Sequence, residues 1–238
     1  MRIITGIYKG RRFDIPRSFK ARPTTDFAKE NIFNVLNSYI DLEGIRALDL
    51  FAGTGSISLE LLSRGCSQVV SVEADRDHAR FIGECVRKLG VTNHQLIRGD
   101  VFRYLKSAQK SFNLERDAVA LNAAQPQLNR DAAALNSHRP LNLEHSGEAA
   151  LNGHRPLNRG EAAIEHPDKG RAFSFIFADP PYALPNLPDI PDLVLQSGLL
   201  APGGVFVFEH GKQNDFSSHP CFREHRAYGS VNFSIFTT

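Results

Sequence analysis

Apolar and polar positions follow two periods along most of the chain, one typical of strands and one typical of helices. Short apolar runs rich in β-branched and aromatic residues predict buried strands, and apolar residues three and four positions apart predict helices. The expected strands are 46–51, 68–72, 95–98, 173–178 and 205–209. The expected helices are 56–64, 76–89, 101–110 and 192–200. This alternation is typical of an α/β fold in which helices cover both faces of a parallel sheet.

The two ends of the chain depart from this alternation. Near the start, two short runs (2–8 and 11–15) meet at Lys9-Gly10 and predict a β-hairpin. A helix is expected over 28–40, preceded by Thr25 and Asp26, which are good N-cap residues. The last two runs, 223–228 and 231–236, flank Gly229-Ser230 and predict a second hairpin. One edge strand of the sheet should therefore be antiparallel.

A repeated segment of low complexity interrupts the pattern. His138–Asn142 returns as His154–Asn158, in a stretch rich in Ala, Asn, His and Glu and poor in aromatic and β-branched residues. So polar a segment cannot bury enough apolar surface to offset the entropy lost on ordering, and we expect a disordered insert. The chain then divides into an N-terminal extension (1–44), an α/β domain in two pieces (45–112 and 171–238) and the insert (113–170).

The composition narrows the class of protein. Hydrophobic residues make up 42% of the chain, but no apolar stretch approaches the roughly 20 residues that would cross a membrane. The N-terminus lacks the apolar core and cleavage site of a signal peptide. The three cysteines, Cys66, Cys85 and Cys221, are widely spaced and indicate neither a disulfide framework nor a zinc site. We expect a cytoplasmic protein that binds no metal ion.

Positive charge is concentrated near the start of the chain, although the net charge is only +2. Through residue 22 the only acid is Asp14. Clustered Arg and Lys indicate contact with a phosphate backbone, whereas the plainer explanation is a solvated edge. The candidate nucleic-acid contacts are Arg2, Lys9, Arg11, Arg12, Arg17 and Lys20.

Asp179-Pro180-Pro181-Tyr182 is the strongest candidate site. It follows the apolar run 173–178, and the prolines must end that strand because they cannot donate to a sheet ladder. Ligands of open α/β sheets bind at the carboxyl ends of such strands. A carboxylate beside an aromatic face suits a planar substrate with an amino group, such as a nucleobase. The plainer alternative is a strand-to-loop turn whose tyrosine packs locally.

A glycine-containing loop follows the first strand of the domain. Gly53 and Gly55 allow a ligand to approach the backbone, and the helix that follows offers free N–H groups. A nicotinamide fingerprint would have a third glycine at position 58, where this chain has Ser58, so a dehydrogenase is disfavoured. Glu73 ends the second strand at a spacing suited to ribose hydroxyls, and Asp100 follows the third. Each acid alone could be a helix cap, but together they favour a nucleotide site.

Together these motifs resemble the class I S-adenosylmethionine-dependent methyltransferases. The run from Phe51 to Ser56 resembles their first motif, and 179–182 resembles the Asp/Asn-Pro-Pro-Tyr/Phe motif of enzymes that methylate amino groups. Three further segments, at 2–11, 22–26 and 30–36, narrow the resemblance to the RsmD family. That resemblance covers 1–112 and 171–238 and leaves the insert outside.

The resemblance implies a Rossmann-like sheet of order 3-2-1-4-5-7-6, with the last strand antiparallel. It implies methylation of the exocyclic N2 amine of a guanine in small-subunit (16S) ribosomal RNA, at guanine 966. The partner would be that RNA or an assembling 30S particle, and the protein a monomer. The residues implied to hold S-adenosylmethionine are Arg22, Thr24, Thr25, Asp49, Phe51, Gly53, Gly55, Glu73, Asp100 and Asp179. Asp179 and Pro180 would accept hydrogen bonds from the amine, and Tyr182 would stack on the base.

Three other functions share parts of this pattern. A DNA adenine N6-methyltransferase uses the same four-residue motif, but this chain leaves little room for a separate target-recognition domain. A non-catalytic RNA-binding protein on the same fold is disfavoured by the intact Asp179, Tyr182 and Glu73. A methyltransferase acting on protein amines is disfavoured by Asp rather than Asn at position 179 and by the basic N-terminus.

Overall fold

A computed structural model describes residues 1–19, 25–135 and 172–238. Within 25–135, side chains are described only as far as residue 120. The chain divides into two units, Met1–Lys110 with His166–Thr238, and Ser111–Glu165. The helices are α1 (Asp26–Leu36), α2 (Ser56–Ser63), α3 (Arg76–Leu89), α4 (Val101–Leu135) and α5 (Ile190–Leu195), with a 3-10 turn, η1 (Leu187–Asp189). The strands are β1 (Arg46–Leu50), β2 (Gln68–Glu73), β3 (His94–Arg98), β4 (Phe173–Ala178), β5 (Leu200–His210), β6 (Phe222–Tyr228) and β7 (Val231–Thr237).

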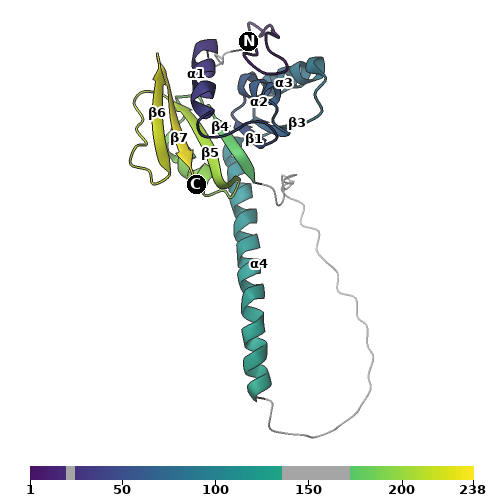
Figure 1. Ribbon diagram of the computed structural model, residues 1–238, viewed down its shortest axis with the longest axis vertical. Coiled ribbons are helices and arrows are strands. Elements are labelled where there is room, and N and C mark those ends of the chain that lie inside the picture. The colour runs from purple at the N-terminus through teal and green to yellow at the C-terminus, as the bar shows by residue number, and fades with distance from the viewer. Residues whose placement is uncertain (20–24, 136–171) are drawn as a thin grey trace. The chain divides into compact units, whose positions relative to one another are not determined.

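The first unit is built on one seven-stranded sheet of order β3-β2-β1-β4-β5-β7-β6 (Figure 1). Strands β1 to β5 pair in parallel, whereas β7 is antiparallel to both β5 and β6. This topology confirms the expected α/β fold, the strand order and the antiparallel last strand.

Apolar side chains alternate across the sheet and create two cores. In β4, Phe175 and Phe177 face the core that contains the buried sides of α1, α2 and α3. Ile176 and Ala178 face the other core, with the first turns of α4 and with α5. Because successive side chains of a strand point to opposite faces, the continuous apolar run 173–178 is what a strand buried on both faces requires.

The predicted N-terminal hairpin is present but shorter than expected. Residues 1–3 pair with 10–13 through the Arg2–Arg12 bridge and through backbone hydrogen bonds from Ile3 N–H to the Arg11 carbonyl and from Phe13 N–H to the Met1 carbonyl, both at 3.0 Å. The backbone N–H groups of Ile4 and Thr5 donate instead to the Glu60 carboxylate on α2, at 2.7 and 3.0 Å. The N–H of Tyr8 donates to Ser63 Oγ at 3.0 Å. Residues 4–8 therefore use on α2 the hydrogen bonds that a longer hairpin would have needed.

Helix α4 continues well past the expected end near residue 110, to Leu135. Its residues 101–110 belong to the first unit and 111–135 to the second. Residues 111–135 include seven Ala and four Leu, which favour a helix, but also Pro126, which disfavours one, so local propensity alone does not account for the continuation. The repeated pentapeptide and the rest of the insert, 136–170, lie outside the described residues.

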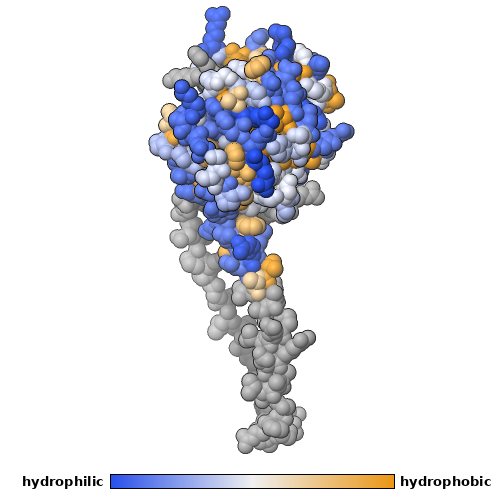
Figure 2. All heavy atoms as spheres, turned by 60° about the vertical axis from the view of Figure 1, so that its left-hand side comes forward, coloured by the Kyte–Doolittle hydropathy of each residue, from blue (hydrophilic) through white to orange (hydrophobic). Residues whose placement is uncertain are grey.

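The face in Figure 2 is mainly hydrophilic, with hydrophobic residues scattered among polar ones. Within the described ranges, no helix combines the length and apolarity needed to span a membrane.

Candidate functional site at the carboxyl ends of the parallel strands

The registers of the parallel strands bring the predicted site residues to one edge of the sheet. Leu50 at the end of β1 lies level with Val72 of β2 and with Ala178 of β4. Ala178 in turn lies level with Phe208 of β5. The next residues along these strands are Phe51, Glu73, Asp179 and Glu209, so the ends of four strands bring a row of candidate groups to one edge of the sheet, although β5 continues to His210. The Asp179 N–H also approaches the Leu50 carbonyl, at 3.4 Å.

The loop from Phe51 to Gly55 turns sharply between β1 and α2. Phe51 has a φ of 60°, which a non-glycine residue adopts only under strain, and Gly53 and Gly55 have φ of 55° and 73°. A Cβ on Gly55 would lie 2.9 Å from Ile82 Cγ1, so packing against α3 also requires glycine there. At Gly53 a Cβ would meet nothing nearer than the Phe51 carbonyl oxygen at 3.8 Å. The backbone at Gly53 therefore borders open space that a ligand could enter.

Glu73 connects this loop to β2. Its Oε2 accepts the Gly53 N–H at 2.7 Å, and its Oε1 accepts the Asp75 N–H at 2.8 Å. Although Glu73 is buried, each carboxylate oxygen can accept a further hydrogen bond. His78 Nδ1 also lies 3.8 Å from Glu73 Oε1. The side chain therefore shapes the loop, and its contact with ribose hydroxyls stays a prediction.

Asp49 lies beneath the loop and is buried among polar groups. Its carboxylate accepts hydrogen bonds from the Ser58 N–H, at 3.0 Å, and from the Ser58 hydroxyl. Ser58 Oγ lies 2.6 Å from Ser71 Oγ, which lies 2.7 Å from His94 Nε2. Burial raises the pKa of Asp49 to about 7, although the Ser58 hydrogen bonds oppose this rise. With 1% of its surface exposed, Asp49 anchors the first turn of α2, and its contact with a cofactor stays a prediction.

Two other predicted cofactor residues cap helices. Asp100 Oδ1 accepts the Arg103 N–H at 2.9 Å, and Thr25 Oγ1 accepts the Ala28 N–H at 3.1 Å. Both side chains are exposed, so capping does not prevent a ligand contact. Arg22 and Thr24, predicted to close over the cofactor, lie outside the described residues.

The motif at 179–182 follows β4 as predicted. Pro180 is buried, and the Leu184 N–H donates to the Pro181 carbonyl at 3.0 Å, closing a turn. The Tyr182 hydroxyl donates to Glu209 Oε1 at 2.8 Å, while 39% of the Tyr182 surface stays exposed. Burial, and then the Glu209 charge, raise the pKa of Tyr182 above its ordinary value. The hydroxyl is thus anchored while part of the ring stays accessible at the edge of the sheet.

Sequence reasoning did not assign Glu209 to the site. The residue is 4% exposed at the end of β5, where it holds the tyrosine of the motif. The available signal was its position, because it ends an apolar strand as Glu73 does. Its partner is distant in sequence, so the contact itself could not be predicted.

A buried ion pair joins the N-terminal segment to this site. Lys29 Nζ on α1 donates to the Arg2 carbonyl at 2.7 Å and to Ser56 Oγ, just after the glycine loop, at 3.0 Å. Glu60 Oε2 lies 3.8 Å from Lys29 Nζ, and Glu60 Oε1 lies 3.0 Å from Arg64 Nε. Lys29 and Glu60 are both 0% exposed. Burial lowers the pKa of Lys29, while the Glu60 charge raises it.

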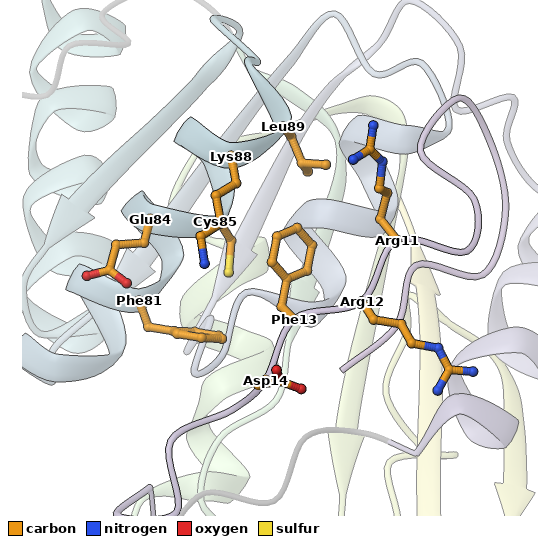
Figure 3. Close-up of a pocket in the computed structure, with 9 residues that line it drawn as sticks. All are labelled: Arg11, Arg12, Phe13, Asp14, Phe81, Glu84, Cys85, Lys88 and Leu89. Atoms are coloured by element: carbon orange, nitrogen blue, oxygen red, sulfur yellow. The ribbon is translucent and has the colours of Figure 1, made fainter.

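The predicted nucleic-acid contacts lie on the segment that this pair holds in place. Lys9, Arg11, Arg12 and Arg17 are exposed, and the partly exposed Arg2 pairs with Asp26 at 3.1 Å. Lys20 lies outside the described residues. Arg11 and Arg12 line a pocket of about 390 Å³ between this segment and α3. Figure 3 shows Phe13 at this pocket, with Glu84, Cys85 and Lys88 on the α3 side.

In the part of the chain that the structure describes, no cluster of His, Cys, Asp or Glu side chains could hold a metal ion. The residues gathered at the sheet edge are suited to hydrogen bonding, stacking and charge, through carboxylates, backbone N–H groups and an aromatic ring. Such a site can position a nucleotide-like ligand beside a planar amine.

Comparison with known proteins places the chain in a family. The protein YlbH of Bacillus subtilis (strain 168) is 40% identical over 111 residues, which are 46% of this chain and 59% of YlbH. "Ribosomal RNA small subunit methyltransferase D" of Buchnera aphidicola subsp. Baizongia pistaciae is 30% identical over 114 residues, which are 48% of this chain and 58% of that protein. The chain thus spans less than two thirds of the length of either relative.

A solved structure of a hypothetical protein from Thermus thermophilus has the same fold, with a TM-score of 0.66 and 24% identity over 100% of this chain and 99% of that one. The model of the family described as "Conserved hypothetical protein 95" matches residues 1–122 and 128–237. This match extends into the insert that the sequence resemblance left outside. The chain belongs to this family, which is the RsmD family that its motifs resemble.

Proposed function

We propose that the protein uses S-adenosylmethionine to methylate the N2 amine of a guanine in small-subunit ribosomal RNA, at guanine 966. The observation that carries this proposal is the register of β1 and β4, which brings Asp179 beside the start of the glycine loop at Phe51, while Glu209 at the next strand holds Tyr182. The relative from Buchnera, named a small-subunit rRNA methyltransferase, supports RNA as the substrate.

The residues at the sheet edge fit the proposed cofactor. Glu73 can accept hydrogen bonds from the ribose hydroxyls, and Asp100, which follows the next strand, can contact the adenine. The open space at Gly53 lets the ligand approach the backbone of the loop. When bound, S-adenosylmethionine supplies a methyl group made electrophilic by a positive sulfonium. The protein must then hold an amine in line with that methyl group.

Asp179 and Pro180 would prepare the amine. Its lone pair is shared with the guanine ring, which makes it a weak nucleophile. Hydrogen bonds from the amine to the Asp179 carboxylate and the Pro180 carbonyl would favour a tetrahedral nitrogen and free that lone pair. They would also counter the positive charge that grows on nitrogen as the new bond forms, and so stabilise the transition state more than the ground state. The methylated amine can then lose a proton to solvent, so Asp179 need not act as a base.

Tyr182 and the N-terminal cations would bind the RNA. With its hydroxyl held by Glu209, the ring is pre-positioned to stack on an unpaired or extruded base, an interaction worth about 1–3 kcal/mol. The exposed cations at Lys9, Arg11, Arg12 and Arg17 would contact phosphates.

Labelled methyl transfer tests the proposal. The purified chain is given unmodified small-subunit RNA, assembled 30S particles or duplex DNA, and the labelled nucleoside is identified after digestion. We expect label in N2-methylguanosine from RNA or particles and none from DNA. Label in N6-methyladenine would instead establish the DNA adenine alternative, and a chain that binds RNA but transfers no methyl would establish the non-catalytic one.

A further inference from the structure

A groove lined by arginines lies on the opposite flank of the site from Tyr182. Arg76 and Arg80 of α3 and Arg98 at the end of β3 line a shallow, open groove of about 550 Å³, together with Ala79 and Leu96. All three arginines are exposed. The candidate RNA contacts predicted from the sequence do not include them.

The charge of this groove is only partly compensated. Arg80 pairs with Asp77 at 3.1 Å, in a contact where both side chains are about two-thirds exposed. Asp75, the other nearby acid on α3, accepts the N–H groups of Asp77 and His78 as the helix N-cap. No carboxylate in the described ranges pairs with Arg76 or Arg98. The groove therefore presents an excess of positive charge to solvent.

The opposite edge strand, β6, carries an exposed arginine, Arg223, and a paired one, Arg226. Arginines at an edge can simply prevent the strand from pairing with another chain. On β6, however, Arg226 forms an ion pair with Glu224, which also accepts the Tyr39 hydroxyl at 2.7 Å. Protection of the β3 edge can account for Arg98 but not for Arg76 and Arg80, which lie on α3.

The position of the groove relates it to both parts of the proposed RNA site. Arg98 lies level with Glu73 in the β2–β3 register, so the groove borders the row of strand ends. Helix α3 then runs from Arg76 and Arg80 to Lys88, which lines the pocket that also contains Arg11 and Arg12 (Figure 3). Cationic side chains thus lie at both ends of α3, although Asp14 and Glu84 reduce the charge at the second pocket.

We propose that Arg76, Arg80 and Arg98 form a second RNA contact, which binds backbone phosphates of the substrate alongside the N-terminal cations. This inference rests on the proposed function. Guanidinium groups suit it because their planar set of donors matches the oxygens of a phosphate. The contact would orient the RNA across α3 without reading its bases, since phosphate contacts position a nucleic acid and base contacts specify it.

A charge-matched pair of variants tests the proposal. One carries Arg76→Gln, Arg80→Gln and Arg98→Gln. The control carries Lys106→Gln, Lys110→Gln and Arg223→Gln, which remove three exposed cations from α4 and β6. Binding of unmodified small-subunit RNA is measured at several salt concentrations, with S-adenosylhomocysteine binding and thermal unfolding measured alongside. Arg98→Gln alone is a milder variant in case the triple one folds poorly.

We expect the groove variant to lose about tenfold or more in RNA affinity. The slope of log K against log salt concentration should be shallower by about 2 to 3, because each lost phosphate contact reduces that slope by roughly 0.7–0.9. S-adenosylhomocysteine affinity should stay unchanged, and the control should bind RNA like the wild type. Arg98→Gln alone should reduce the slope by roughly one contact.

Three results would overturn this inference. If the wild type methylates RNA but the groove variant keeps its RNA affinity and salt slope, the groove is not an RNA contact and the proposed function stands. If the groove variant loses S-adenosylhomocysteine affinity while RNA affinity is unchanged, the arginines serve the cofactor site. If the wild type neither binds nor methylates small-subunit RNA, both the groove contact and the proposed function are wrong.

Discussion

Asp179 is the residue on which the proposed chemistry depends most. Asp179→Ala would remove the charged acceptor for the amine, and we expect methyl transfer to fall by about 10²-fold or more, the usual loss when one transition-state hydrogen bond is removed. Asp179→Asn keeps an acceptor oxygen and should lose less. Binding of S-adenosylhomocysteine, measured by calorimetry, should stay nearly intact in both variants. An Asp179→Ala enzyme with wild-type turnover would exclude this role.

Variants of Tyr182 can separate the stacking of its ring on the base from the anchoring of its hydroxyl by Glu209. Tyr182→Phe keeps the ring but loses the hydrogen bond to Glu209, whereas Tyr182→Ala loses both. RNA affinity should therefore fall little in the Phe variant and by about 1–3 kcal/mol in the Ala variant. Equilibrium binding to the same unmodified RNA measures both. If the two variants bound equally well, the ring would not stack on the base.

The raised pKa of Asp49 predicts that the free energy of unfolding depends on pH. Its pKa in the folded protein is about 7, against an ordinary value of 3.8. The folded state therefore binds a proton that the unfolded state has released, and the contribution of Asp49 to stability is lost as pH rises from about 4 through 7. Urea unfolding across that range should show Asp49→Asn losing less stability than the wild type. Parallel pH curves for the two proteins would contradict the assignment.

At the scale of elements, α1 is held to α2 by the buried pair of Lys29 and Glu60. Lys29→Met would leave Glu60 with Arg64 and two backbone donors but without its buried cation. We expect the free energy of unfolding to fall by about 3 kcal/mol, as for other broken buried pairs, with faster amide exchange at Ile4 and Thr5. Glu30→Gln, at an exposed position of the same helix, is the control. Equal stability of the two variants would show that the pair is not needed.

The same elements show what local sequence can predict. Strand β4 and helix α3 have the predicted bounds, because prolines end the apolar run of the strand and Asp75 and Gly90 cap the helix. The N-terminal hairpin is shorter than predicted because donors at Ile4, Thr5 and Tyr8 bond to Glu60 and Ser63, more than fifty residues away. Glu209 was missed for the same reason, since its role depends on a tyrosine of another strand end. Caps and strand stops are encoded locally, whereas buried polar contacts are created by the fold.

At the scale of the whole molecule, the site belongs to the first unit alone. Every described candidate residue lies within Met1–Lys110 or His166–Thr238. The sheet that aligns these residues is interrupted in sequence between α4 and β4, yet β4 pairs with both β1 and β5. The fold of this unit therefore requires the two pieces of the chain to meet, and the strand pairing described for its sheet lies within 46–98 and 173–237.

Deletion of 115–168 tests whether the insert contributes to the proposed reaction. The remaining 111–114 and 169–172 would connect α4 to β4, and connections of a few residues are common between a helix and the next strand of a parallel sheet. We expect the shortened chain to fold, to bind S-adenosylhomocysteine and to transfer methyl groups to RNA at the wild-type rate, with Asp179→Ala in the same background as the inactive control. A deletion that folds and binds the cofactor product but transfers no methyl would assign the insert a part in RNA binding or catalysis. Lower stability alone would not assign the insert such a part, because shortening the connection can strain the fold while the site at the opposite ends of the strands is unchanged.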